Sequence, residues 1–442
     1  MKTETYSLSR FSVLFDNEDE NYLCYNSRSN SFISITKDLY DFLTKNGNLN
    51  IEQLPENVVS NLIKMKIIVT SEEDDEYVER LKLQNYINRY SRDHLSLTLL
   101  PTMACNLRCP YCFEAHKSAK SMNEEVIDSL IQFINRQKYA KTYSLCWYGG
   151  EPLLRVDIMR NILQRLEKDV VLERIHHYII TNGGLLNDKA IELFQEFPLD
   201  NIQITFDGLP QNHNQKRYLP NNRGTFDIIL NNIKRYLNTF PNKRITIRVN
   251  IDNQNKEEFH QVYKLLHCEL KDFQQNLFIY PGILKDENPS FSICNNNLMN
   301  NNDIKKLYLE LKEKDVPVKY YPVQKLKGCT ANQICGYVIG TDGEIYRCWL
   351  DVGEKKYVVG NIKDDQITNE KLFLKYFSIG DCFNDQKCLN CALLPICSGG
   401  CPNNRIQNAC YGKHFEICPV QQPNNYQGLK EYLQMHYQLN TI

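Results

Sequence analysis

The sequence lacks a long hydrophobic run, an export signal and a net charge of either sign. No stretch of about 18 apolar residues, the minimum for a membrane-spanning helix, occurs in the 442 residues. Residues 1–20 carry charges where a secretory signal needs an apolar segment. The 52 Lys and Arg residues balance 53 Asp and Glu residues without a basic block, so the electrostatic signature of nucleic-acid binding is missing. We therefore expect no membrane insertion, no export and no nucleic-acid partner.

Cysteine, in contrast, is abundant. The chain has 17 cysteines, and ten of them lie between Cys329 and Cys418. Disulfide frameworks belong to small exported domains, whereas this chain is long and has no export signal. The clustering therefore favours thiolates that bind metal, and we expect a reducing, cytoplasmic location.

The chain divides into three segments by pattern. Residues 1–90 have the composition of a small α+β module, with strands expected at 11–15 and 31–35 and helices at 37–44 and 58–65. The acidic run 72–76 is interpreted as a charged surface. Residues 319–442 are rich in Cys, Gly, Pro and Asn with few regular runs, so metal binding is expected to supply folding energy there.

Residues 91–318 alternate short apolar strands with amphipathic helices, which predicts an α/β fold with a parallel sheet. Helices are expected at 123–137 and at 225–237, the second with Thr225 as its N-cap. Ligands of such folds bind at the carboxyl ends of the strands. The six predicted strands are Leu95–Leu100, Tyr143–Tyr148, His177–Thr181, Asn201–Phe206, Arg244–Asn250 and Asn276–Tyr280.

Three cysteines follow the first of these strands in the spacing C-x3-C-x2-C. A closed zinc site takes four ligands, whereas a 4Fe-4S cluster held by three thiolates leaves one iron open. Half of a zinc site completed by distant cysteines is the alternative. The three residues are Cys105, Cys109 and Cys112.

This loop, CNLRCPYC, resembles the cluster motif of the radical SAM enzymes, and GGEP after the second strand resembles another motif of that family. The resemblance implies that the three cysteines hold a 4Fe-4S cluster whose open iron binds S-adenosyl-L-methionine. It also implies an open (β/α)6 barrel similar to a partial TIM barrel over about residues 95–315. The implied cofactor contacts are Tyr111 and Phe113 near the adenine, Gly149, Gly150, Glu151 and Pro152 at the methionine end, and Thr205 and Arg217 at the ribose or carboxylate.

Eight further cysteines in the C-terminal segment can form two closed sites of four, and their spacing alone leaves zinc and iron–sulfur equally open. The segment CLNCALLPICSGGCP resembles the SPASM domain, which implies two auxiliary 4Fe-4S clusters, making three clusters in all. The implied ligands are Cys329, Cys335, Cys348 and Cys401 for the first cluster, and Cys388, Cys391, Cys397 and Cys418 for the second. With every position filled, an electron-transfer role is favoured for these clusters.

The resemblance implies an oxidoreductase that cleaves S-adenosylmethionine and oxidatively modifies, by crosslinking, a ribosomally made precursor peptide (RiPP). The order and size of residues 1–90 are similar to modules that bind a peptide leader as an added strand. A low-potential electron donor of flavodoxin or ferredoxin type is also implied. No residue is assigned as a catalytic acid or base.

Two alternatives stay open. One is an anaerobic sulfatase-maturing enzyme, which forms formylglycine; the family places an Asp after the third ligand of the first auxiliary cluster, where this chain has Trp349 and the nearest acid is Asp351. The other is a non-catalytic iron–sulfur electron carrier. Among the cysteines left over, Cys382 and Cys410 lie between the implied ligands, and the rest are expected to be small buried hydrophobes.

Overall fold

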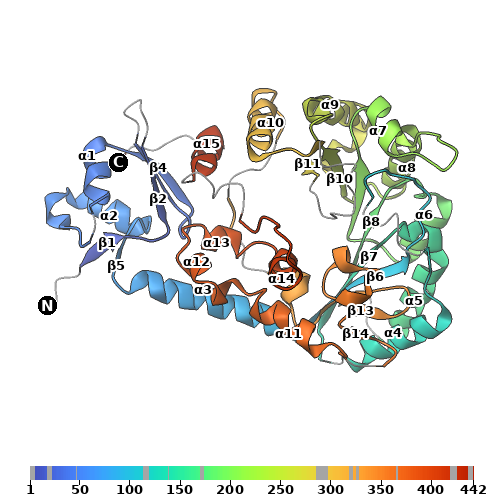
Figure 1. Ribbon diagram of the computed structural model, residues 1–442. Coiled ribbons are helices and arrows are strands. Elements are labelled where there is room, and N and C mark those ends of the chain that lie inside the picture. Colours follow the sequence, from blue (N-terminus) through green and yellow to red (C-terminus); the bar gives the residue numbers. More distant parts are fainter. Residues whose placement is uncertain are drawn as a thin grey trace. The chain divides into compact units, whose positions relative to one another are not determined.

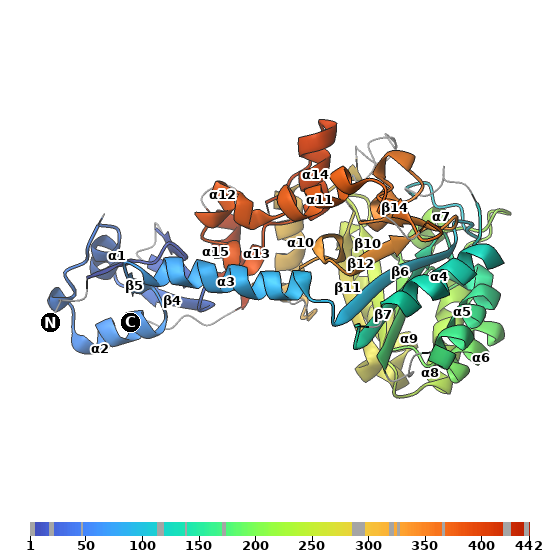
Figure 2. The same ribbon diagram turned by 90° about the horizontal axis from the view of Figure 1, so that it is seen from below.

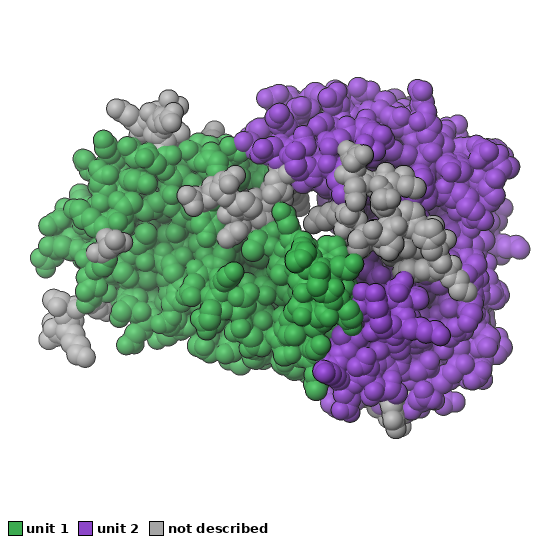
Figure 3. All heavy atoms as spheres, viewed as in Figure 1, with its two compact units in different colours: residues 1–91, 319–334, 374–442 green, residues 92–318, 335–373 purple. Residues whose placement is uncertain are grey.

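The structure, a computed structural model, forms two compact units (Figure 3). Unit 1 contains residues 1–91, 319–334 and 374–442, and unit 2 contains residues 92–318 and 335–373. The N-terminal segment thus shares a unit with much of the cysteine-rich segment, while the three-segment division stays a prediction. The structure describes residues 5–16, 22–45, 47–112, 119–137, 139–169, 174–284, 297–317, 322–324, 328–364, 367–418, 426–436 and 442.

Unit 2 is built on a nine-stranded sheet in the order β11-β10-β9-β8-β7-β6-β12-β13-β14. Its six strands from β6 to β11 run parallel and confirm the six predicted strands. These strands are β6 (His94–Thr102), β7 (Thr142–Gly149), β8 (Ile175–Thr181), β9 (Asn201–Phe206), β10 (Ile245–Ile251) and β11 (Leu277–Ile283).

Three short strands from the C-terminal segment extend this sheet beyond β6. Strand β12 (Gly336–Ile339) pairs parallel with β6, and β13 (Glu344–Tyr346) and β14 (Gly360–Asn361) follow in antiparallel register. The sequence did not predict them, because strands of two to four residues are too short to show a period.

Helices cover the outer face of the curved sheet (Figures 1 and 2). In α4 the apolar positions Val126, Leu130 and Ile134 recur at helical spacing and are buried, and the Asn123 side chain caps its first turn. The helices of unit 2 are α4 (Glu124–Arg136), α5 (Val156–Asp169), α6 (Asp188–Glu196), α7 (Pro210–Lys216), α8 (Phe226–Thr239), α9 (Phe259–Glu269) and α10 (Asn301–Glu313), while α11 (Glu370–Ser378) lies across the boundary between the units. Among the described residues, none of the helices is both long enough and apolar enough to cross a membrane.

The N-terminal part of unit 1 contains a two-stranded sheet, a three-stranded sheet and three helices. Strand β1 (Tyr6–Leu8) pairs with β5 (Ile68–Thr70), and the second sheet has the order β2-β3-β4. The remaining elements are β2 (Ser12–Phe15), β3 (Tyr22–Asn26), β4 (Ser31–Ile35), α1 (Lys37–Leu43), α2 (Glu56–Lys64) and α3 (Glu73–Tyr90).

The three-stranded sheet is buried on both faces. One face packs on α1 and α2 through residues such as Cys24 and Ile33. The other, which includes Leu23 and Tyr25, packs on α13 (Leu394–Cys397) and α15 (Gln427–His436). All five residues of β3 are therefore buried. Without an alternation of buried and exposed positions, the sequence did not predict this strand.

The acidic run forms the first turn of the long helix α3 (Figure 1). Negative side chains stabilise a helix at this end, because the helix dipole is positive there. The interpretation of the run as surface is wrong for Asp74, which is only 5% exposed. The Asp74 carboxylate accepts hydrogen bonds from the Ser9 hydroxyl (3.1 Å) and the Arg10 backbone N–H (2.7 Å) and pairs with Arg28 (3.2 Å). This residue therefore anchors α3 to the turn between β1 and β2.

We predict that Asp74→Ala weakens this anchor by about 1–3 kcal/mol, because it leaves buried donors without an acceptor. Hydrogen–deuterium exchange of the full chain should show faster exchange at the amides of Ser9 and Arg10. Asp75→Ala is the matched control, since that carboxylate is 72% exposed and also neighbours Arg10. Equal exchange in the two variants would contradict the anchoring role.

Candidate functional site

The cysteine loop lies at the carboxyl end of β6. The Leu107 backbone N–H donates to the Cys105 sulfur at 3.4 Å, and the Cys112 N–H donates to the Cys109 carbonyl at 3.2 Å. Burial raises the pKa of the Cys105 thiol to about 12, and Glu151 and the other two thiols add to the shift. Burial also raises the pKa of Cys109. Thiolates at these poorly solvated positions would therefore need a positive charge beside them, such as that of a bound metal.

The two glycines of GGEP allow β7 to end directly against this loop. A Cβ on Gly150 would lie 2.3 Å from the Ala104 carbonyl oxygen, and Gly149 adopts a φ of +114°. The Gly150 N–H donates to the Thr102 carbonyl at 3.2 Å, and the Glu151 N–H donates to the Ala104 carbonyl at 2.9 Å. The glycines are required because the two backbones are in contact here.

Glu151 links the ends of β7 and β8. Its fully buried carboxylate accepts hydrogen bonds from the Thr181 hydroxyl (2.7 Å) and from the Asn182 N–H (2.8 Å). Burial raises the pKa of this carboxyl, and the hydrogen bonds oppose the rise. The Asn182 side chain donates to Asn106 at 2.8 Å and contacts the Cys105 sulfur at 3.8 Å. The end of β8 thereby holds the start of the cysteine loop.

A second buried carboxylate, Asp207, follows β9 and holds the other end of the loop. It accepts hydrogen bonds from the Tyr111 hydroxyl and from the Asn250 amide (2.9 Å), and Arg217 lies 4.0 Å away. Arg217 also donates to the Tyr111 hydroxyl at 2.9 Å. Burial raises the pKa of Asp207, and Arg217 opposes the rise most strongly. Tyr111 is thus tied to β9, to β10 and to the residue that ends α7.

The backbone of Arg217 is fixed by a chain of hydrogen bonds between neutral groups. The Asp207 N–H donates to His213 Nδ1 (3.3 Å), so the His213 proton is on Nε2 and is donated to Thr225 (3.0 Å). The Thr225 hydroxyl then donates to the Arg217 carbonyl at 2.8 Å. Burial and Arg217 hold the pKa of His213 well below its ordinary value. Thr225 occupies the expected N-cap position of α8, but its hydroxyl does not cap the helix, because it is used here.

The structure brings together most of the predicted cofactor contacts of this site. Arg217 reaches Tyr111, and Pro152 is buried in a 3-10 turn, Pro152–Arg155. Thr205 is buried on β9, and among the described residues no hydrogen bond joins it to Arg217. Phe113 lies outside the described residues.

Three further residues of the network were not among the predicted cofactor contacts: Asn182, Asp207 and Asn250. Each lies at or directly after the carboxyl end of a strand, where ligand sites of parallel sheets form, and this position already marks the NGG and DG segments that begin with Asn182 and Asp207. Sequence alone assigns these polar residues no partner.

The second set of C-terminal cysteines lies entirely in unit 1. Arg405 donates to the Cys388 sulfur at 2.9 Å, Tyr426 hydrogen-bonds Cys391, and Cys391 acts electrostatically on Cys418. Burial raises the pKa of Cys388 to about 11, and Arg405 opposes the rise. These contacts place Cys391 close to Cys418 and Arg405 against Cys388.

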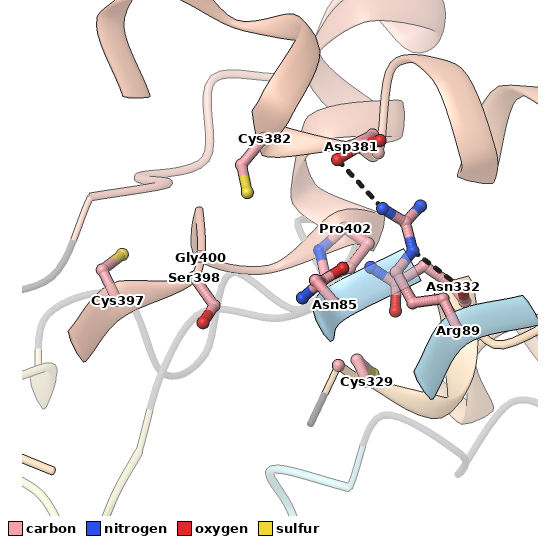
Figure 4. Close-up of a pocket in the computed structure, with 12 residues that line it drawn as sticks. Asn85, Arg89, Cys329, Asn332, Asp381, Cys382, Cys397, Ser398, Gly400 and Pro402 are labelled. Atoms are coloured by element: carbon pink, nitrogen blue, oxygen red, sulfur yellow. Dashed lines mark hydrogen bonds and ion pairs between the residues drawn. The ribbon is translucent and has the colours of Figure 1, made fainter. Parts of the chain in front are cut away.

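The first set is divided between the units: Cys329 and Cys401 belong to unit 1, and Cys335 and Cys348 belong to unit 2. A cavity of about 280 Å³ in unit 1 is lined by Cys329, Cys397 and Cys382 (Figure 4). Beside it the buried Arg89 and Asp381 form an ion pair of 2.9 Å. Cys382, one of the two left-over cysteines named above, therefore lines the same cavity as the implied ligands Cys329 and Cys397.

Among the described residues, no three His, Cys, Asp or Glu side chains converge on one metal ion. A 4Fe-4S cluster needs no such convergence, because each thiolate binds a different iron. Three thiolates on one loop, a buried carboxylate behind them and the buried Arg217 Nε, which has no hydrogen-bond partner among the described residues, fit a cluster with an anionic ligand beside it.

Residues 99–266 match the family model of the radical SAM superfamily. The chain carries a radical SAM domain. A cysteine-type anaerobic sulfatase-maturating enzyme of Clostridium novyi (strain NT) is 27% identical over 353 residues, which cover 73% of this chain and 92% of that enzyme.

Two solved structures share the fold. Native anSMEcpe with bound AdoMet and Cp18Cys peptide superposes with a TM-score of 0.58 at 20% identity, covering 77% of this chain and 96% of that chain. Streptococcus suis SuiB bound to precursor peptide SuiA gives a TM-score of 0.53 at 16% identity, covering 94% of this chain and all of the other. The predicted fold class is therefore confirmed.

A radical SAM domain binds S-adenosylmethionine and a 4Fe-4S cluster. In this chain Cys105, Cys109 and Cys112 would hold the cluster, and the backbone of GGEP would bind the methionine end of the cofactor. The free donor of Arg217 would take an acceptor of the cofactor.

We predict that Tyr111→Phe lowers the affinity for S-adenosylmethionine about 5- to 150-fold without loss of iron, because Asp207 and Arg217 each lose a buried hydrogen-bond partner. Iron analysis and equilibrium binding of the reconstituted chain measure both quantities. Tyr178→Phe on β8 is the matched control. Affinity that equals the wild-type value would remove Tyr111 from the positioning network.

Proposed function

We propose that this chain is a radical SAM oxidoreductase that modifies a ribosomally made precursor peptide, and that it forms a crosslink. When bound, the cofactor and the reduced cluster supply a radical that takes a hydrogen atom from an unactivated carbon. Crosslinking then requires loss of a second hydrogen as a proton and an electron. The eight C-terminal cysteines would hold the auxiliary clusters that accept this electron.

The share of the chain that matches a fold seen with a precursor peptide is the observation that carries this proposal. The fold shared with SuiB, whose structure contains a precursor peptide, extends over 94% of this chain. The fold shared with anSMEcpe extends over 77%. The wider coverage of this chain by the SuiB fold favours a precursor peptide as the substrate.

The edge of the three-stranded sheet supports peptide binding by strand addition. Strand β4 has a partner only on the β3 side among the described strands. On its other side the Ile442 N–H donates to the Ser34 carbonyl at 3.2 Å, and the Ile442 side chain packs on the cluster that contains Ile33 and Ile35. The edge thus accepts an extended backbone with an aliphatic side chain, which is the chemistry of a leader segment.

Sulfatase maturation is the second candidate, supported by the 27% identity to the sulfatase-maturating enzyme. Trp349, at the position of the expected Asp, is 42% exposed and packs on Tyr148, with the two ring centroids 5.7 Å apart. Asp351, the nearest acid, is buried, with 2% of its surface exposed. A carboxylate is therefore present near Cys348, two residues beyond the family position.

The test is an anaerobic incubation of reconstituted enzyme with S-adenosylmethionine, a reductant and a candidate peptide. One arm uses the short peptide encoded beside the gene, and the other uses a sulfatase peptide with Cys or Ser. We expect 5′-deoxyadenosine and a precursor peptide lighter by two hydrogens, without a carbonyl group. The triple variant of Cys105, Cys109 and Cys112 to Ala should form neither product.

A sulfatase peptide that gains an aldehyde, detected with a carbonyl reagent, would favour the second candidate. Cofactor cleavage without change in either peptide would contradict both substrate assignments. Absence of 5′-deoxyadenosine from the wild type under all conditions would leave only the electron-carrier function.

Strand addition can be tested separately. The Ser34 carbonyl points away from β3, so its N–H points the same way. Ser34→Pro removes this N–H from an edge strand, where proline is tolerated, and is expected to weaken peptide binding about tenfold. Ser34→Ala keeps the N–H and serves as the control in a fluorescence anisotropy titration. Equal affinities for the two variants would contradict binding at this edge.

A further inference from the structure

We infer that Arg405 raises the reduction potential of the second auxiliary cluster by hydrogen-bonding its ligand Cys388. The inference rests on the proposed assignment of Cys388, Cys391, Cys397 and Cys418 to that cluster. It adds a role for a residue that is not a ligand. The geometry is contained within unit 1.

Three partners fix the guanidinium of Arg405. Its three nitrogens donate to the Cys388 sulfur (2.9 Å), to an Asp385 oxygen (2.9 Å) and to the Gly399 carbonyl (2.8 Å). The residue lies on α14 (Pro402–Tyr411), and its backbone N–H donates to the Cys401 carbonyl at 3.2 Å. A planar guanidinium held at all three nitrogens has no freedom to turn away from the sulfur.

The charge is close to the sulfur and poorly screened. The Arg405 side chain is 8% exposed, whereas that of Asp385 is 33% exposed. The Asp385 oxygen lies 3.6 Å from the Cys388 sulfur, farther away than the Arg405 nitrogen. Once the thiolate binds iron it has no proton to donate, so the Asp385 carboxylate repels it, whereas the Arg405 guanidinium, 2.9 Å from the sulfur, attracts it.

Reduction places one additional electron, and no proton, on the cluster and its thiolates. Hydrogen bonds to cluster sulfurs and nearby positive charge stabilise the reduced state and raise the potential. Asp385 opposes this effect. The two residues should therefore shift the potential in opposite directions, which a merely structural role of the Arg405–Asp385 pair would not do.

The experiment is a redox titration of the full, reconstituted chain with dithionite, followed by electron paramagnetic resonance. In Arg405→Gln one midpoint is expected to fall by at least about 59 mV, a tenfold change in the one-electron equilibrium. In Asp385→Asn the same midpoint should rise, because a negative charge near the sulfur is removed. Asn also caps helices, so the N-cap of α12 (Gln386–Leu389) is kept. Lys387→Gln removes an exposed positive charge from the same helix and is the control, expected to shift this midpoint much less than Arg405→Gln because solvent screens its charge.

Cys388→Ala identifies which midpoint belongs to this cluster and should lose about four irons per chain. Full iron retention in Cys388→Ala would overturn the ligand assignment, and the inference with it. Iron retained in Arg405→Gln, with no midpoint shifted, would overturn the tuning role alone. If Arg405→Gln loses iron, Asp385→Asn decides: a rise supports the role of the charge pair and an unchanged midpoint overturns it.

Discussion

Two carboxylates buried at the carboxyl edge of the sheet organise the rest of the site. A buried carboxylate is costly unless hydrogen-bond donors surround it. Glu151 finds its donors at the end of β8 and Asp207 finds them in Tyr111 and Asn250, so each fastens the cysteine loop to a neighbouring strand. The loop between Cys105 and Cys112 is thereby held at both ends by residues that are not ligands.

Unit 1 uses the same principle with the opposite charge. The buried guanidinium of Arg405 is satisfied by a sulfur, a carboxylate and a carbonyl, while that of Arg89 pairs with Asp381 beside the cavity. Helix α3 carries Arg89 near its last turn and Asp74 in its first. One helix therefore joins the sheet that offers the β4 edge to the segment that contains the auxiliary cysteines, with both contacts inside one unit.

Most of the parallel sheet could be predicted because its strands are apolar and regularly spaced with helices. Strand β3 escaped prediction because it is buried on both faces, and β12 to β14 escaped because they are short. Asp74 was misread because local charge density carries no information about a partner 65 residues away. Thr225 was placed correctly at a helix start but given the wrong hydrogen bond for the same reason.

The sequence by itself identified the radical SAM domain, because three cysteines in one loop and GGEP after a strand are local spacings, whereas the ligand roles of these cysteines and of the eight C-terminal ones stay predictions. Only the tertiary structure decided which polar residues support them. Asn182, Asp207 and Asn250 lie at the carboxyl ends of three different strands, and Arg405 is 17 residues from the sulfur it contacts. Hydrogen bonds between distant residues depend on how strands and helices pack, and that packing is a property of the whole chain rather than of any motif.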